Sequence, residues 1–371
     1  MEETQARRGP DKEQEGEGVS ERIARQRYAA HFCSVLQTET KLYLKGGENV
    51  QASLRRFDAD WRQIEAAQAW ASKNDAALCS AYVRKIDLLD IRLTPRQRIA
   101  WLEPGLAATR QLKDREAEAE TLSHLGLAYA RLGEPLQSIE LHNQSLLLHR
   151  EIGDRGGEAS DLCNLASAYR QLGEYRTAIE DYELALKIDR EMGTRRGEAV
   201  DCDGLASAYL ALGEMDQAMW YFLSALQIAR DIGDRLAEGS ALGNLGICYK
   251  HQGRLAEAIE RDEQALSIHR EIGNRGGESA ALTNLGLAHH ILGELRTAMD
   301  CYERALIIAR GLNDRSGEAA ILGNLGLVFC ESGQRDRGVA FLQQALTAFE
   351  EVGSPEVERV RAMLTEWGAS G

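Results

Sequence analysis

The residues with the most chemical content in this chain are asparagines that recur at one position of a 40-residue period. A carboxamide both donates and accepts hydrogen bonds, so it can pair with an extended peptide main chain whatever the sequence of that peptide. The alternative is that each asparagine bonds locally or begins a solvated helix face. The set comprises Asn164, Asn244, Asn284 and Asn324, with His124 and Gly204 at the same position of two further copies.

Residues that could act in catalysis or metal binding do not converge in this sequence. It contains no G-x-x-x-x-G-K-[ST], H-E-x-x-H or G-x-S-x-G motif, so we expect neither nucleotide hydrolysis nor another enzymatic activity, and no cofactor. His149 and His269 share one position but stand three repeats apart, and His289 and His290 point to different faces of a helix. Because a metal site needs three or four converging ligands, we expect no metal.

Carboxylates are abundant, but the recurring ones follow an arginine by three residues. This spacing places both side chains on one helix face, which favours ion pairs at helix starts over acid–base catalysis. Each such pair contributes about 0.3 kcal/mol. The pairs are Arg155/Glu158, Arg195/Glu198, Arg235/Glu238, Arg275/Glu278 and Arg315/Glu318.

The composition is that of an acidic, soluble chain of 371 residues with a net charge of −14. This charge opposes binding to nucleic acid or to anionic membranes. No apolar run approaches the roughly 18 residues that span a bilayer, and the charged start lacks the apolar core of a signal peptide, so we expect a cytoplasmic protein. The seven cysteines include no C-x-x-C pair and are expected to be reduced thiols.

Glycines at two positions divide each period into halves. A glycine can adopt the positive φ that ends a helix without steric strain, so the two positions predict two helices per period. We expect Asp154, Asp234, Asn274 and Asp314 to cap the first helices of their repeats. The glycines are Gly133, Gly173, Gly213, Gly253, Gly293 and Gly333 at one position, and Gly153, Gly193, Gly233, Gly273 and Gly353 half a period away.

Each period also carries a fixed apolar pattern. The first helix has leucine, a small residue and an aromatic residue three positions further on, as in Leu165-Ala166-Tyr169. The second helix has alanines seven residues apart, as at Ala178 and Ala185, which lie on one face. One repeat cannot cover these apolar faces alone, so its stability must come from stacking on its neighbours.

This combination resembles the tetratricopeptide repeat, at the 40-residue length found in kinesin light chains, in spindle adaptors of the Pins type and in many bacterial regulators. The resemblance covers about residues 117–353 and implies an all-α fold, a right-handed superhelical solenoid of stacked antiparallel helix pairs. His289, Gly338 and Asp262 depart from the pattern and predict local looseness. The segments RYAAHFCSVLQ and FDADWRQIEAAQAW also look like the region that joins the nucleotide-binding module to the repeat sensor in bacterial signal-transduction ATPases.

The predicted organisation follows from these patterns. Residues 1–20 are expected to be a disordered acidic tail, 21–74 a helical hairpin, 75–116 a degenerate repeat, 117–353 six repeats and 354–371 a capping helix. Within the degenerate repeat we expect one helix over residues 75–93 and a second that opens at Thr94-Pro95 and is kinked by Pro104.

The resemblance further implies that the asparagine position faces a concave groove, where asparagine bonds the backbone of a bound peptide. We therefore expect a non-enzymatic scaffold that binds a peptide or helix of a partner protein. The alternative is the sensor region of a bacterial signal-transduction ATPase or transcriptional regulator, and a homodimer through an exposed end of the stack is left open. The predicted groove residues are Asn164, Asn244, Asn284, Asn324, His124, Ser167, Asp203, Ile247, Thr283, Leu287 and Leu327.

Overall fold

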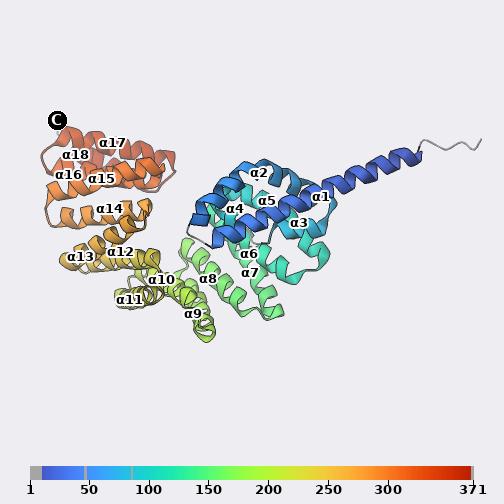
Figure 1. Ribbon diagram of the computed structural model, residues 1–371. Helices are drawn as coiled ribbons and strands as arrows, with labels where there is room; N and C mark the ends of the chain where they lie inside the picture. Colours follow the sequence, from blue (N-terminus) through green and yellow to red (C-terminus); the bar gives the residue numbers. More distant parts are fainter. Residues whose placement is uncertain (1–10, 46–47, 85–86, 369–371) are drawn as a thin grey trace, which may run out of the picture. The chain divides into compact units, whose positions relative to one another are not determined.

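The structure is a computed structural model that describes residues 11–45, 48–84 and 87–368. Within these residues every regular element is an α-helix, from α1 to α18 (Figure 1). Consecutive helices pack against one another, so the predicted all-α array of helix pairs is confirmed. The chain forms two compact units, Met1–Ile188 and Asp189–Gly371, and each is described by itself.

The first unit contains the N-terminal helical hairpin and the first repeats. Helices α1 and α2 pack against each other, and α3 and α5 pack against them. Trp101 of α5 stacks on Trp61 of α2 with 5.5 Å between ring centroids, and the core around them includes Phe57 and Leu102. The helices are α1 (Asp11–Leu44), α2 (Glu48–Asn74), α3 (Ala76–Tyr82), α4 (Asp87–Arg92), α5 (Pro95–Leu112), α6 (Arg115–Leu132), α7 (Pro135–Ile152) and α8 (Arg155–Gln171), while α9 (Tyr175–Met192) runs past Ile188.

The N-terminal part of this unit differs from the prediction in two ways. Helix α1 begins at Asp11, inside the expected disordered tail, because Glu, Lys and Gln extend a helix that packing has already nucleated; residues 1–10 of that tail lie outside the described residues. The single helix expected over residues 75–93 is two helices, α3 and α4. Helix α5 continues through Pro104, where the adjacent Gly105 lies so close to Val83 that no Cβ would fit.

The second unit is a regular stack of helix pairs with a final capping helix. Helices α10 and α11, α12 and α13, α14 and α15, and α16 and α17 form the pairs. The capping helix starts slightly after the predicted Ser354-Pro355. The bounds are α10 (Arg195–Ala211), α11 (Met215–Ile232), α12 (Arg235–His251), α13 (Leu255–Glu271), α14 (Arg275–Ile291), α15 (Leu295–Leu312), α16 (Arg315–Glu331), α17 (Arg335–Glu351) and α18 (Val357–Gly368).

The predicted helix stops and close approaches are confirmed. Gly253, which follows α12, has φ +72°, a backbone conformation that glycine adopts without strain. Asp314 caps α16 by accepting a hydrogen bond from the Gly317 amide at 2.9 Å. The small residue of each first helix lets the paired helix approach: a Cβ on Gly286 would lie 2.7 Å from the ring of Tyr302.

A glutamate clamped by two arginines joins each first helix to the helix before it. The carboxylate of Glu318, only 7% exposed, accepts hydrogen bonds from Arg310 at 2.7 Å and from Arg315 at 3.0 Å. Arg315 is the partner predicted from the i,i+3 spacing, whereas Arg310 comes from the end of the preceding helix, across the turn. This glutamate clamp therefore connects each repeat to the one before it. The clamped glutamates are Glu118, Glu158, Glu198, Glu238, Glu278 and Glu318.

We expect Glu318→Gln to lower the free energy of unfolding by about 1 kcal/mol, because it removes charge-assisted bonds to two half-exposed guanidiniums. The Arg310 hydrogen bond lowers the pKa of Glu318 against the effect of burial, and Arg315 adds to this. The stabilisation is thus present above the ordinary carboxyl pKa and lost below it, so the deficit should shrink as the pH falls below about 4.

Urea unfolding at pH 7 and at pH 3.5 measures both quantities. Glu263→Gln is the matched control, because Glu263 is exposed on α13 and has no recorded ion pair within the part of the chain that the structure describes. A Glu318→Gln protein as stable as wild type at pH 7 would contradict the clamp.

Candidate functional site

In the second unit the first helices of the repeats carry two adjoining pockets. Helices α10, α12, α14 and α16 contact one another in sequence, in addition to their contacts with second helices. A pocket of about 200 Å³, the α10–α12 pocket, is lined by Val200, Asp203 and Ser240 among others. A pocket of about 380 Å³, the α12–α14 pocket, is lined by Ser240, Asn244, Asn284 and several glycines and alanines. Because Ser240 lines both, the pockets form one hollowed path across three helices.

Four predicted groove residues meet on this path. Asn244, Ile247 and Asn284 line the α12–α14 pocket, and Asp203 lines the α10–α12 pocket. Asn244 Nδ2 donates to Asp203 Oδ1 at 3.0 Å, so the two pockets are joined by a hydrogen bond between predicted site residues. The carbonyl oxygen of the Asn244 side chain is thereby oriented and keeps its capacity to accept.

The other predicted residues of this unit lie on neighbouring turns and line neither pocket. Thr283 bonds within its own helix, with Oγ1 donating to the Ser279 carbonyl at 2.8 Å. Leu287 is 37% exposed on α14. Asn324 and Leu327 lie half buried on α16.

Asn284 is held by a buried ion pair that sequence reasoning did not identify. Lys250 Nζ donates to Asn284 Oδ1 at 2.9 Å and lies 3.8 Å from Asp262 Oδ2. The side chain of Asp262 is fully buried, and that of Lys250 is 7% exposed. Asp262 was expected to mark local looseness, yet a Cβ on Gly246 would lie 2.5 Å from its carboxylate, so the site is filled.

Burial dominates the electrostatics of this pair. Burial raises the pKa of Asp262 to about 7, although the charge of Lys250 and side-chain hydrogen bonds from Asn284 and Lys250 oppose the shift. Burial also lowers the pKa of Lys250, although Asp262 opposes that shift. The equivalent positions of the preceding repeat hold Leu210 and Phe222, so an apolar pair has been replaced by charges.

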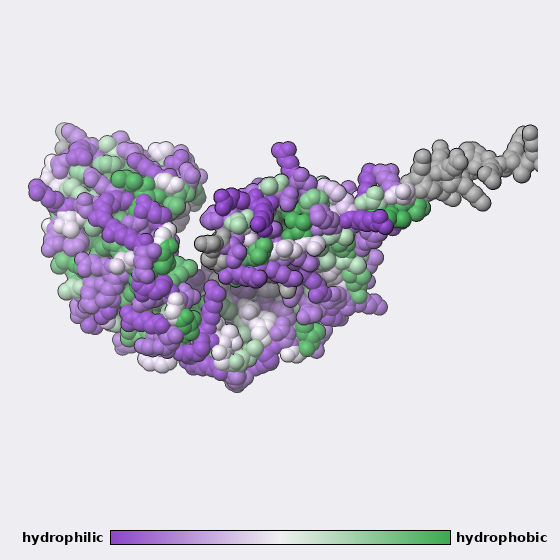
Figure 2. All heavy atoms as spheres, viewed as in Figure 1, coloured by the Kyte–Doolittle hydropathy of each residue, from purple (hydrophilic) through white to green (hydrophobic). Residues whose placement is uncertain are grey.

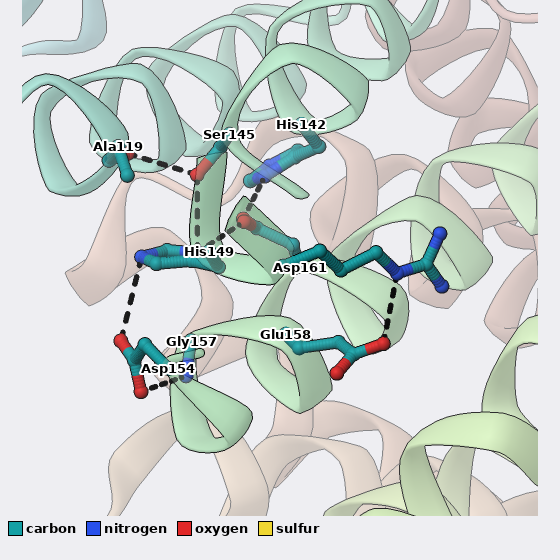
Figure 3. A network of polar contacts seen from close by, with 9 residues as sticks. Ala119, His142, Ser145, His149, Asp154, Gly157, Glu158 and Asp161 are labelled. Atoms are coloured by element: carbon teal, nitrogen blue, oxygen red, sulfur yellow. Dashed lines mark hydrogen bonds and ion pairs between the residues drawn. The ribbon is translucent and has the colours of Figure 1, made fainter. Parts of the chain in front are cut away.

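The first unit holds a different buried polar network, on α7 and α8 (Figure 3). His142 Nδ1 lies 3.0 Å from Asp161 Oδ1, and His149 Nδ1 lies 2.8 Å from Asp161 Oδ2. Ser145 donates to the Ala119 carbonyl at 2.8 Å and lies beside His149. All three residues of the His–Asp–His bridge are buried, so this bridge links two helices and has no opening for a ligand.

The three predicted groove residues of this unit lie on α6 and α8. His124 lies on α6 and its Nδ1 is buried; burial, and then the charge of Arg98, lowers the pKa of His124 to about 4, so the ring is neutral at pH 7. Ser167 hydrogen-bonds the phenol of Tyr182. Asn164 lies half buried on α8.

In the first unit a pocket of about 300 Å³ is lined by Arg110, Lys113, Arg115 and Glu118, so it adjoins a glutamate clamp and contains none of the predicted groove residues. The face visible in Figure 2 is mostly hydrophilic, with apolar residues in small separate areas. Among the described residues, no group of three His, Cys, Asp or Glu side chains could hold a metal ion. No helix in the described part of the chain is long and apolar enough to cross a membrane.

We expect the double variant Lys250→Leu/Asp262→Phe, which copies Leu210 and Phe222, to raise the free energy of unfolding by about 1 kcal/mol or more, because apolar packing replaces a desolvated ion pair. Each single variant should lower it by about 3 kcal/mol, because one buried charge then lacks its partner.

The gain should also depend on pH. Between about pH 4 and 7 folded wild type binds a proton at Asp262 that the unfolded chain has released, so its stability falls as the pH rises through this window. The double variant lacks this titration, so its advantage should be larger at pH 7.5 than at pH 5. Urea midpoints at both pH values test this, and a double variant less stable than wild type would show that the ion pair stabilises the fold.

The chain was compared with known protein sequences and with solved structures. A comparison with curated protein sequences finds no match. Among solved structures, the chain is similar to a signal-transduction ATPase with numerous domains (STAND) with a tetratricopeptide repeat sensor from Pyrococcus horikoshii, with a TM-score of 0.61 and 17% identity over 92% of this chain and 54% of that one. It is also similar to aspartyl phosphate phosphatase F from Bacillus subtilis, with a TM-score of 0.57 and 14% identity over 91% and 94% of the two chains.

A third similar structure is BtubC (BKLC) from P. vanneervenii, with a TM-score of 0.52 and 24% identity over 60% of this chain and 93% of that one. These identities show a shared fold and nothing finer. The family model described as tetratricopeptide repeat matches residues 106–191, 199–271 and 277–351, which together are more than half of the chain. The chain therefore belongs to the tetratricopeptide repeat family.

Proposed function

We propose that the chain is a non-enzymatic, cytoplasmic scaffold that binds an extended peptide segment of a partner protein along the path formed by the α10–α12 and α12–α14 pockets. The observation that carries the proposal is the joined pair Asn244 and Asp203, which places an oriented carboxamide between two pockets. A peptide main chain that crosses there can donate to Asn244 Oδ1 while its side chains enter the pockets on either side.

Two further features support a peptide ligand over a nucleic acid. The net charge of −14 repels a polyanion. Asn284 is held in place by Lys250, so a second carboxamide one repeat further along is fixed before a ligand arrives. Prior ordering of this kind lowers the entropy lost on binding.

We expect Asn244→Ala to weaken peptide binding about fivefold, because its carboxamide contributes a main-chain hydrogen bond of about 1 kcal/mol. Asn284 is left intact, because its loss would also strand Lys250. The probe is the best binder from a random dodecamer phage library selected on the full chain, made as a fluorescent peptide and titrated by anisotropy.

Gln343→Ala is the matched control, since it removes a carboxamide that is exposed on second helix α17. It should leave both affinity and melting temperature unchanged. Selection that enriches no peptide, or an Asn244→Ala protein that binds as tightly as wild type, would refute the proposed function.

A second candidate is the sensor region of a signal-transduction ATPase or a regulator of that type. The observation in its favour is that the likeness to the STAND protein extends over 92% of this chain, which is more than the repeats alone. In that case a separate ATPase should change its rate of ATP hydrolysis when the full chain is added. Sedimentation equilibrium of the chain alone would show whether it forms a homodimer.

A further inference from the structure

His269 lies at the floor of the α12–α14 pocket, with its side chain 5% exposed. Its ring occupies the space that side chains would fill on both adjacent first helices. A Cβ on Gly239 would lie 2.8 Å from the imidazole, and a Cβ on Gly277 would lie 2.5 Å from it. Ala199 and Ala319 hold the position of Gly239 in other repeats. The glycine therefore makes room for an imidazole at this place.

His149, at the same position in the first unit, shows what His269 lacks. His149 is bonded to the buried carboxylate of Asp161, twelve residues further along the chain. The residue twelve positions after His269 is Ala281, which lines the pocket. With alanine in place of the carboxylate, the imidazole of His269 faces an opening in the protein instead of an ionised partner.

The hydrogen bonds of Asn274 determine which nitrogen of His269 carries the proton. Asn274 Oδ1 accepts from the Gly277 amide at 3.1 Å, so its Nδ2, which must donate, is the atom 3.2 Å from His269 Nδ1. His269 Nδ1 is therefore an acceptor, and the proton lies on Nε2. Burial also lowers the pKa of His269, so the ring is neutral at pH 7. No partner for Nε2 is recorded among the described residues, which leaves one donor unused.

The rest of the pocket matches an uncharged ligand group. None of its lining residues is Asp, Glu, Lys or Arg. A charged side chain that entered would lose its hydration without gaining a counter-ion, which costs several kcal/mol. An acceptor is present, because Asn244 Nδ2 is used by Asp203 while Asn244 Oδ1 stays available. The pocket thus offers the Nε2–H donor of His269 and the Oδ1 acceptor of Asn244 on a surface formed mainly by glycines and alanines.

We infer that the α12–α14 pocket is the anchor site for one tyrosine side chain of the bound peptide. The phenol oxygen accepts from His269 Nε2–H and donates to Asn244 Oδ1, while the ring packs on the glycine and alanine walls. The volume of about 380 Å³ suits an aromatic residue, and Tyr is a common anchor because it unites a large apolar face with one polar tip. This inference rests on the proposed peptide binding and specifies which side chain the peptide must carry.

The test is a double-mutant cycle between the selected dodecamer peptide and the full chain. In the peptide each residue is replaced in turn by Tyr, Phe, Ala, Glu and Lys. We expect one position at which Tyr binds about tenfold more tightly than Phe, the size of one to two hydrogen bonds, and at which Glu and Lys bind more weakly still. In His269→Phe, which keeps a ring between the two glycines, the preference for Tyr over Phe should fall about threefold or more, because only the bond to Asn244 Oδ1 remains.

Filling the pocket gives a second, independent measurement. Gly243 lines the pocket, and a Cβ there meets nothing within 4 Å, so Gly243→Leu should fold normally and occupy the ring's space. We expect it to remove at least nine-tenths of the affinity for the Tyr peptide. Gly323→Leu, at the same position two repeats later and outside this pocket, should keep that affinity. Melting temperatures confirm that both variants are folded.

The outcomes separate the two proposals. Peptides that bind through Asn244 but show no position with a Tyr preference, or a preference for Phe, Glu or Lys that equals or exceeds it, overturn the tyrosine site and leave the peptide scaffold standing. A Tyr preference that is undiminished in His269→Phe also overturns it. Failure of every peptide to bind removes both proposals.

Discussion

The glutamate clamp is the interaction on which the geometry of this chain depends. Each copy ties the first turn of one helix to the last turn of the preceding helix, across a residue with positive φ that is glycine in four copies, Lys113 in one and Asn313 in another. The arginines are about half exposed, so one clamp stabilises the fold only modestly. Its effect lies in repetition, because the same clamp at the same position orients every successive pair alike, and stability in such arrays is a sum over neighbours.

A constant orientation between repeats lets single residues determine local chemistry. Where Tyr302 fills the gap left by Gly286, the helix pair has an apolar core. Where Asp262 takes the equivalent place, the core holds a carboxylate that must be matched by Lys250, and Lys250 in turn holds Asn284. A buried ion pair is weak as a stabilising device. Its position directly beneath a pocket residue is consistent with a role in ordering that residue.

Much of the fold could be predicted from the sequence, because the same residue pattern recurs in six repeats. The helix stops, the caps at Asp314 and Asn274, and the close approach at Gly286 were all predictable from local rules. Helices α3 and α4 were not, because no second copy of their pattern exists to compare. The second arginine of each clamp escaped because it acts across a turn, eight residues before its glutamate, where helix spacing rules do not apply.

The candidate site was harder to predict than the fold, because it is formed where small residues leave space and not where large side chains meet. Gly239, Gly243 and Ala281 create the α12–α14 pocket from two helices by leaving space, and no rule of spacing along one helix reveals that. The presence of a histidine at this position of the repeat did not reveal the site either. Burial opposes protonation of His149, but the Asp161 hydrogen bond outweighs it and raises the pKa of His149, whereas burial alone lowers the pKa of His269.

His149 and His269 occupy the same position in two different repeats. They differ in role because of the residue that follows each of them twelve places later. A carboxylate at that place fixes the ring of His149 within the core, while alanine leaves His269 without an ionised partner, at the lining of a pocket. In a repeat protein, therefore, the functional unit is a pair of positions on adjacent helices, since the clamp keeps their separation constant and only the residue types change. Pockets in such chains are best sought where one member of a recurring polar pair has become glycine or alanine.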